Sequence, residues 1–378
     1  MEEALAIVAA ITAILTIGLT IGYVIYGRRY YCEIDPNAYH EAPCVTVIIA
    51  ARDEAAEIGA TVQSLLRQRV VAELVVVDDG SVDQTATIVR QIADTDNRVI
   101  ALSAPVLERG WVGKSAALQF GAQKASTEFV LFTDADVLIG DGVIATAVSL
   151  MRKDSLEHLG GYFSIRCRSA AEAICAPVLS SIATLVLFSS ASTKGAATGA
   201  FNLLRTDAYR RIKGHQAIRS QIVDDVALAR LAKTRCTKTA FADFSPNVRV
   251  HLFTGLSGYV ACVKRSGMAY LSETPAAMSL IYSIAVFGLG AFWMMAPVLS
   301  LGFLLHHSWP PALSLFCSYG SGTAFFSCSR RYHDAHLGWV FLYPFPVMLI
   351  AAAIALGALD RIRKKNVAWR GRYYPAPS

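Results

Sequence analysis

The stretch FVLFTDAD, residues 129–136, decides the expected fold. It is a short apolar run that ends in two carboxylates, Asp134 and Asp136, one residue apart. Such a run predicts a buried β-strand that delivers oxygen ligands to its C-terminal edge, where open α/β sheets bind ligands. Hard oxygen ligands suit Mg²⁺ or Mn²⁺, and such an ion usually shares its coordination with substrate phosphates. For Asp136 taken alone, a turn or helix-capping role is the competing interpretation.

Two earlier stretches have the same form. VTVIIAA, residues 45–51, runs into the polar triplet RDE, and LVVVDD, residues 74–79, runs into GSVD. Each is followed by a helical pattern, at residues 58–66 and 85–92. This β-α-β-α order with near-continuous apolar strands predicts an α/β domain with a mainly parallel sheet. Three strands then point acidic or polar ends at one edge, which indicates a nucleotide and metal site.

Five motifs in this order resemble those of family 2 glycosyltransferases with the GT-A (nucleotide-diphospho-sugar transferase) fold. They are AARDE (50–54), VDDGSVD (77–83), GKSAAL (113–118), DAD (134–136) and DDVALA (224–229). The segments GWVGK (110–114), VDDVALAR (223–230) and WRGRY (369–373) are similar to membrane-bound lipid-glycosylating members, the hopene-associated and carotenoid types. The resemblance implies a hexosyltransferase whose GT-A catalytic domain spans residues 43–255.

The resemblance also implies how the donor nucleotide is held. Ala51 and Glu54 match the first-strand loop that packs on the nucleotide, although the family often has Asn where this chain has Asp53. Asp79, or its neighbour Asp78, looks like the acid that recognises the base. Since a carboxylate at this point accepts the uracil N–H, a UDP-sugar is the favoured donor.

Three further residues are expected around the diphosphate. The resemblance implies that Asp136 ligates Mg²⁺ or Mn²⁺, helped by Asp134, which lies towards the ribose and sugar. Lys114 follows a glycine and opens a helical stretch, where an ammonium can meet phosphate oxygens or the donor sugar. A solvated surface lysine is the competing interpretation.

The acceptor side is expected at two other motifs. Asp225 is the candidate general base, and it stands with Asp224 in the first turn of a predicted helix. Helix capping is the competing role for this pair. Gly199, Ala200 and Phe201 match the small-residue acceptor loop of the family, where a plain turn is the alternative. The resemblance implies one in-line displacement with inversion at the anomeric carbon.

Two weaker signals follow the acceptor motifs. Arg249 and His251 are candidates for closing over the donor phosphates, although a lone histidine is more often a packed residue. Residues 256–274 have an apolar face beside Lys264 and Arg265, which predicts an interfacial helix.

Composition indicates an enzyme domain with membrane segments. Only 17% of the 378 residues are charged and 54% are hydrophobic. Within residues 1–30, Ala4 to Ile25 form an apolar stretch long enough to span a bilayer. An uncleaved anchor is favoured over a signal peptide, because two glutamates precede it. Arg28 and Arg29 follow it, which by the positive-inside rule places the catalytic domain in the cytoplasm of an integral membrane protein, at the inner or plasma membrane if bacterial.

Three more apolar runs lie in residues 275–360, at 276–305, 312–328 and 338–359. The first run can span the bilayer or form two short or re-entrant helices around Pro297. Basic residues flank both ends of the last run, and Pro344 and Pro346 permit a re-entrant hairpin there, which leaves the number of spans at two to four. The basic tail, residues 361–378, accounts for much of the net charge of +6 and is expected to lie on anionic headgroups rather than on nucleic acid. The eight cysteines show no metal-ligand spacing and are expected to be reduced thiols.

The function expected from these features is transfer of one sugar to a membrane lipid. A processive polysaccharide synthase is the first alternative, but no tryptophan follows an arginine as in the Gln-x-x-Arg-Trp motif of those enzymes. A catalytically silent scaffold is the second alternative, and the complete set of acids argues against it. A nucleotidyltransferase is disfavoured because the first strand is not followed by a glycine-rich phosphate loop.

Overall fold

The computed structural model describes residues 2–35, 42, 44–271, 274–369 and 372–374. The chain forms two compact units. One, the sheet unit, comprises residues 30–164 and 186–251, and the other, the helical unit, comprises residues 1–29, 165–185 and 252–378. The sheet unit is therefore interrupted in sequence by part of the helical unit.

The sheet unit is built on a seven-stranded sheet. Its order is β3 (Val99–Ser103), β2 (Val71–Asp78), β1 (Val45–Ala51), β4 (Phe129–Phe132), β8 (Asn202–Arg205), β6 (His158–Tyr162) and β9 (Thr239–Asp243). The pairs β1–β2, β2–β3, β1–β4 and β6–β9 are parallel, whereas β8 runs antiparallel to both β4 and β6. The mainly parallel α/β sheet predicted from the three apolar runs is confirmed. Two short strands, β5 (Val137–Ile139) and β10 (Val248–Val250), pair antiparallel beside it, and β7 (Ser164–Ile165) ends the first part of the unit.

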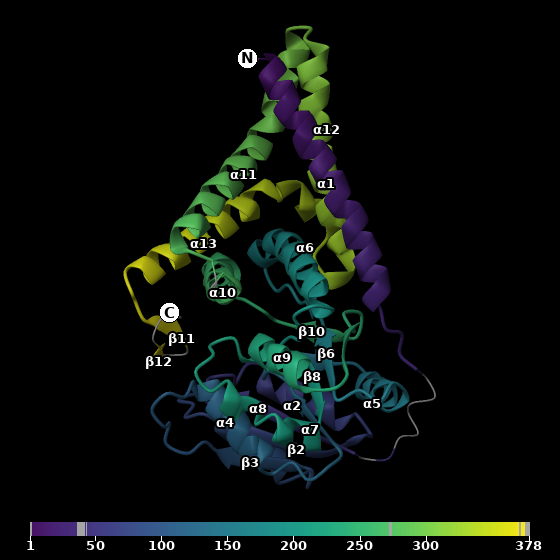
Figure 1. Cartoon of the computed structure of the whole chain (residues 1–378), viewed down its shortest axis with the longest axis vertical. Coiled ribbons are helices and arrows are strands. Elements are labelled where there is room, and N and C mark those ends of the chain that lie inside the picture. The colour runs from purple at the N-terminus through teal and green to yellow at the C-terminus, as the bar shows by residue number, and fades with distance from the viewer. Residues whose placement is uncertain (1, 36–41, 43, 272–273, 370–371, 375–378) are drawn as a thin grey trace. The chain divides into compact units, whose positions relative to one another are not determined.

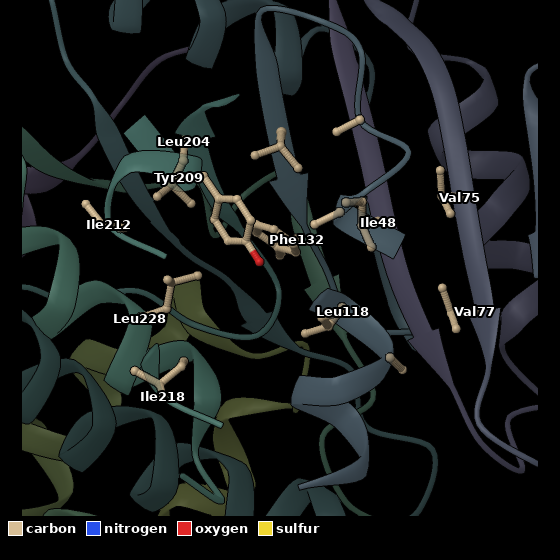
Figure 2. Close-up of a cluster of buried hydrophobic side chains, with 14 of the residues drawn as sticks. Ile48, Val75, Val77, Leu118, Phe132, Leu204, Tyr209, Ile212, Ile218 and Leu228 are labelled. Carbon is tan, nitrogen blue, oxygen red and sulfur yellow. The ribbon is translucent and has the colours of Figure 1, made fainter. Parts of the chain in front are cut away.

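Helices cover the sheet. They are α2 (Ile58–Leu66), α3 (Thr85–Ala93), α4 (Gly113–Ala122), α5 (Val143–Lys153), α7 (Thr206–Arg211), α8 (Gly214–Ala217) and α9 (Asp224–Arg235). Helix α4 packs closely on β1 and β2 because Gly121 has no side chain: a Cβ there would lie 2.8 Å from Ile48 Cγ2. Figure 2 shows the resulting core, in which Ile48 and Val75 from the strands, Leu118 from α4 and Leu228 from α9 share one buried cluster.

The helical unit contains long apolar helices. Its elements are α1 (Glu2–Tyr30), α6 (Ala170–Ala191), α10 (Gly255–Tyr270), α11 (Ala276–Leu305), α12 (Trp309–Ser327), α13 (Pro344–Ile362), two 3₁₀ segments (Cys328–Tyr332 and Leu337–Leu342) and the hairpin β11 (Val367–Trp369) and β12 (Arg372–Tyr374). Among the described residues, α1, α6, α11 and α13 are long and apolar enough to cross a membrane. Arg370, Gly371 and residues 375–378 of the predicted basic tail lie outside the described residues, as do Met1 and residues 272–273 of two other predicted segments.

Helices α1, α11 and α12 lie together at the end of this unit that carries the N-terminus (Figure 1). Ala9 packs against Ala296 and Leu315 in a small buried cluster. Thr12 Oγ1 lies 2.6 Å from Ser318 Oγ, so α1 and α12 also share a hydrogen bond. Outward-facing residues of α1 are apolar and exposed, Ile14 to 68%, as expected for a helix surrounded by lipid.

The structure decides between the two interpretations of the first apolar run. It is one continuous helix, α11, rather than two short ones around Pro297. Helix α6, which no pattern in the sequence had marked as a span, is a fourth candidate. Its last turns belong to the sheet unit, where Phe188 packs edge-on against Tyr30, Tyr162 and Phe241.

Candidate active site

The carboxyl ends of β1, β2 and β4 meet at one edge of the sheet. Ala51 pairs with Asp78 in the parallel register, and the backbone N–H of Asp79 donates to Ala51 O at 2.8 Å. Asp79 is buried, and its side chain and carbonyl lie 3.8 and 3.0 Å from Arg52 Nη1. Asp78 instead lines a cavity of about 30 Å³, roughly the room of one water molecule. The two acids therefore occupy different surroundings, and both stand at the edge where a nucleotide is expected.

The loops that follow β1 and β2 are bound to each other. Asp53 has a left-handed backbone, with φ 53°, and its Oδ1 accepts the N–H of Val82 at 2.8 Å. The Glu54 N–H donates to Thr85 Oγ1 at 2.8 Å. Asn and Asp are the non-glycine residues that best tolerate the left-handed region. Asp53 therefore adopts this backbone as readily as an Asn at the same position would.

Lys114 joins the acidic motifs. Its Nζ lies 2.6 Å from Asp134 Oδ1 and 3.0 Å from Asp224 Oδ1, although these residues come from three elements far apart in sequence. The lysine side chain is 15% exposed. Burial alone would lower the pKa of Lys114, but the carboxylates of Asp134 and Asp224 raise it overall. The lysine is therefore a fixed cation between the expected donor and acceptor motifs, and not a solvated surface residue.

The 199–201 loop lies directly against Asp134. The Asp134 N–H donates to Gly199 O at 2.8 Å, and Thr133 Oγ1 donates to Ala200 O at 2.8 Å. A Cβ on Gly199 would lie only 2.1 Å from Asp134 Oδ2, so no other residue fits without moving the carboxylate. Phe201 is fully buried and packs on Phe244 with ring centroids 5.0 Å apart. Gly199 is thus the loop residue in contact with the acids, whereas Phe201 belongs to the core.

Asp136 has an unusual environment. Its Oδ1 is buried with no hydrogen-bond partner, and burial together with the nearby carboxylates of Asp134 and Glu54 raises its pKa to about 8. A concentration of acids around an unpartnered carboxylate oxygen fits a divalent cation. Within the described part of the chain, no group of three or more His, Cys, Asp or Glu residues is arranged to hold a metal. Asp134 and Asp136 therefore fit an ion that takes its other ligands from a diphosphate and water, as Mg²⁺ commonly does.

Asp224 and Asp225 begin α9. Asp225 Oδ1 accepts the backbone N–H of Val226 at 2.8 Å. Burial and the adjacent Asp224 raise the pKa of Asp225 to about 6, which is suitable for a general base near neutral pH. The main chain at this point is held by Asn202, whose Nδ2 donates to Asp225 O at 3.3 Å and whose Oδ1 lies 2.9 Å from His158 Nε2.

Two residues of the site, His215 and Tyr209, were missed from sequence. His215 Nε2 lies 3.9 Å from Asp224 Oδ2, and Nδ1 of the same ring lies 2.9 Å from the Tyr209 hydroxyl. Asn202, which follows the 199–201 loop, supports Asp225 as described. The sequence carries only a lone histidine and a lone tyrosine here, with no spacing that predicts a pair. Of the two weaker candidates, His251 lies 3.9 Å from Glu57, and Arg249 is exposed on β10.

Comparisons with known proteins bear on the family and on the fold. Residues 46–166 match the profile of Glycosyl transferase family 2. The 4,4'-diaponeurosporenoate glycosyltransferase of Staphylococcus aureus (strain USA300) is 31% identical over 165 residues, 41% of this chain and 37% of that protein. The match thus spans well under half of the relative's length.

Among solved structures, the mannosyltransferase PcManGT of Pyrobaculum calidifontis, in complex with GDP-Man and Mn²⁺, has a TM-score of 0.52. The likeness covers 96% of this chain and 99% of that one at 17% identity, which shows a shared fold. The predicted GT-A fold, with long apolar helices before and after it, is confirmed.

Proposed function

Starting from the match of residues 46–166 to the profile of glycosyl transferase family 2, we propose that this chain transfers a single sugar from a nucleotide-sugar, with UDP-sugar favoured, to a membrane lipid. The observation that carries the proposal is the contact of Lys114 with both Asp134 and Asp224. It joins the motif expected at the donor with the motif expected at the acceptor. The reaction proposed is a single displacement with inversion at the anomeric carbon.

Each residue then has a defined task. Asp79 accepts a hydrogen bond from the uracil N–H, and Ala51 and Glu54 form the wall against the nucleotide. Lys114, held beside Asp134, offers its positive charge to the phosphates or the sugar of the donor. Mg²⁺ or Mn²⁺ held by Asp136 and Asp134 would neutralise charge on the departing diphosphate. Asp225 takes the proton of the acceptor hydroxyl as that oxygen attacks, and its pKa of about 6 leaves it ionised at neutral pH.

The lipid acceptor is supported by the position of α6. This apolar helix ends at Ala191, and Gly199 follows eight residues later, a chain length of at most roughly 28 Å. Gly199 is in turn adjacent to Asp134. The loop proposed to face the acceptor is thus a direct continuation of a candidate membrane helix. A relative named for diaponeurosporenoate as its acceptor points in the same direction.

The positions of charged residues support a cytoplasmic catalytic domain. Glu2 and Glu3 lie in the first turn of α1, and Arg28 and Arg29 lie in its last turn. The positive end of the first span faces the cytoplasm in most membrane proteins. This orientation gives the enzyme access to cytoplasmic nucleotide-sugars.

The proposal is tested with protein purified in detergent. Nucleoside diphosphate release is measured from UDP-sugars and from GDP-mannose, with Mg²⁺ or Mn²⁺, with and without a lipid extract of the host. Asp225→Asn is compared with wild type, and Asp207→Asn, an exposed acid on α7, is the matched control. Lipid-stimulated release that Asp225→Asn alone abolishes is the expected result. If no donor releases nucleoside diphosphate, either with or without lipid, the catalytically silent scaffold becomes the better explanation.

A further inference from the structure

Contacts within the helical unit show which helix ends share a side of the membrane. Helix α1 runs beside α12: Ser308 Oγ donates to Glu2 Oε2 at 3.1 Å near one end, and the ring centroids of Tyr23 and Tyr332 lie 6.0 Å apart near the other. A Cβ on Gly27 would lie 3.4 Å from the Tyr332 hydroxyl. The arginines next to these aromatic residues therefore lie at one end of the two helices: Arg28, Arg29, Arg330 and Arg331.

Helices α11 and α12 form an antiparallel hairpin. Ser300 Oγ donates to Ala312 O at 2.8 Å, and Trp293 Nε1 donates to Ser318 Oγ at 3.1 Å. The start of α11 therefore lies on the same side as the end of α12, the side marked by the four arginines and here named the arginine side. Glu2 lies at the opposite end, so α1, α11 and α12 together satisfy the positive-inside rule as three crossings.

Residues 328–362, here named the re-entrant segment, leave the arginine side and return to it. The segment begins where α12 ends, and its turn at Tyr343 packs against the hairpin. The Tyr343 ring centroid lies 5.2 Å from that of Trp293 in α11, and the Tyr343 hydroxyl donates to a carbonyl of α12 at 3.3 Å. Near the end of α13, Arg361 Nη1 donates to Leu271 O at 2.8 Å, five residues before α11 begins. In Figure 1, α13 stays away from the end at which α1, α11 and α12 converge, and this path leaves no crossing for α13.

Helix α10 supports this path. Its Lys264 forms an ion pair with Asp360 in the last turn of α13, and its Tyr259 hydroxyl donates to Pro346 O in the first turn at 3.2 Å. Because α10 is bound to both ends of α13, a crossing by α13 would carry α10 into the hydrocarbon with it. Lys264 and Arg265 would then lie in the hydrocarbon, where charged side chains are costly. At the surface of one leaflet, by contrast, long basic side chains reach the headgroups.

The sheet itself limits the path of α6. Strand β6 precedes this helix and β8 follows it, yet the two strands pair, with Gly160 opposite Asn202. A single crossing by α6 would place these strands on opposite sides of the membrane. Helix α6 therefore begins and ends on the side of the sheet unit. This is also the arginine side, because the sheet unit begins at Tyr30, directly after Arg29.

We infer that, of the helices in the described part of the chain, only α1, α11 and α12 cross the membrane, and that α6 and the re-entrant segment enter a single leaflet, the one on the side of the sheet unit. Lipids of that leaflet are the partner of this surface. Its apolar side chains include those of Phe341, Phe345 and Leu356, which are 58, 37 and 48% exposed. The exposed basic residues that follow α13 complement anionic headgroups: Arg363, Lys364 and Lys365.

The test maps access to water from each side of the membrane in the full-length protein. Cysteines are introduced one at a time at three exposed positions: His307→Cys in the turn between α11 and α12, Phe341→Cys in the re-entrant segment and Lys365→Cys after α13. Spheroplasts and inverted membrane vesicles are treated with a membrane-impermeant maleimide, and mass spectrometry identifies the labelled residue, so that native thiols do not interfere. A second measurement needs no substitution: a green fluorescent protein that fluoresces only in the cytoplasm is fused to the C-terminus.

We expect His307→Cys to react in spheroplasts, Lys365→Cys to react in inverted vesicles, Phe341→Cys to react in neither, and the fused reporter to fluoresce. If Lys365→Cys reacts in spheroplasts, as His307→Cys does, α13 crosses the membrane and the inference is wrong. Reaction of Phe341→Cys in either preparation would also overturn it, because that residue would then lie in water. If a variant fails to accumulate, the fusion decides, since a dark reporter on accumulated protein refutes the inference. These readouts do not require sugar transfer, so the inference and the proposed function can fail separately.

Discussion

Substitution of Gly199 by alanine tests the geometry of the site most directly. An added Cβ would lie 2.1 Å from Asp134 Oδ2 and 2.8 Å from its Cγ. Ordinary contact needs about 3.5 Å, so the carboxylate must move by more than about 1 Å. Gly199 is outside the left-handed region, so the alanine backbone itself is unstrained. The change therefore acts on Asp134 and on its 2.6 Å contact with Lys114, and not on the fold.

A displacement of about 1 Å at a positioned group costs about 100-fold in rate, and we expect kcat/KM for sugar transfer to fall by this factor. The assay is release of nucleoside diphosphate under the conditions that support wild-type turnover, together with a melting curve. Gly59→Ala on α2 is the control, because its Cβ would lie at ordinary contact, 3.5 Å from Ile88 Cγ2. Unchanged kcat/KM in a folded Gly199→Ala protein would refute the assignment of Asp134 to the reaction.

Three other predictions follow from the titratable groups. Asp225 must be ionised to act as a base, and its pKa is raised to about 6, so kcat/KM should rise as the pH increases through about 6. Asp225→Asn should lower kcat/KM at least about 100-fold. A wild-type kcat/KM that does not change with pH in this range would exclude Asp225 as the base. Burial lowers the pKa of His158 to about 4, below its ordinary value of 6.5. Its contribution to the free energy of unfolding is therefore complete above pH 6.5 and is lost as the pH falls through 4. The free energy lost is about 3 kcal/mol. Denaturant unfolding of wild type and His158→Gln between pH 7.5 and 4 measures this, and equal slopes in the two proteins would contradict it. All eight cysteines have free thiols, so reductant should leave the melting temperature unchanged, and eight thiols should react with Ellman's reagent after unfolding without reduction.

The sheet and the acids were predictable because their signals are local. An apolar run that ends in carboxylates is readable from a few residues, and parallel topology brings such ends to one edge. Val45–Ala51, Phe129–Phe132 and the helix at residues 58–66 were confirmed in this way. The order of the motifs predicted that Lys114, Asp134 and Asp224 belong to one site, but it did not predict the contacts between them.

Other features depend on contacts that no local pattern reveals. Helix α6 contains Glu172, Pro177 and several serines, which dilute its apolar signal. In the structure these groups are satisfied within or near the helix, for example Ser180 Oγ donates to Ala176 O at 2.7 Å and Glu172 Oε2 accepts the N–H of Arg168 at 2.6 Å. The pairing of His215 with Tyr209 depends on a turn at Lys213, whose backbone is left-handed with φ 63°.

The interruption of the sheet by α6 has a consequence for biosynthesis. Strand β8, which lies between β4 and β6, follows α6 in the chain and is therefore synthesised after it. The apolar helix thus emerges from the ribosome while the central sheet still lacks the strand that joins its two halves. Removing both ends of the chain would not yield a simple soluble catalytic fragment, since residues 165–185 would remain within it. In this chain, the apolar segment is therefore made before the sheet can be closed.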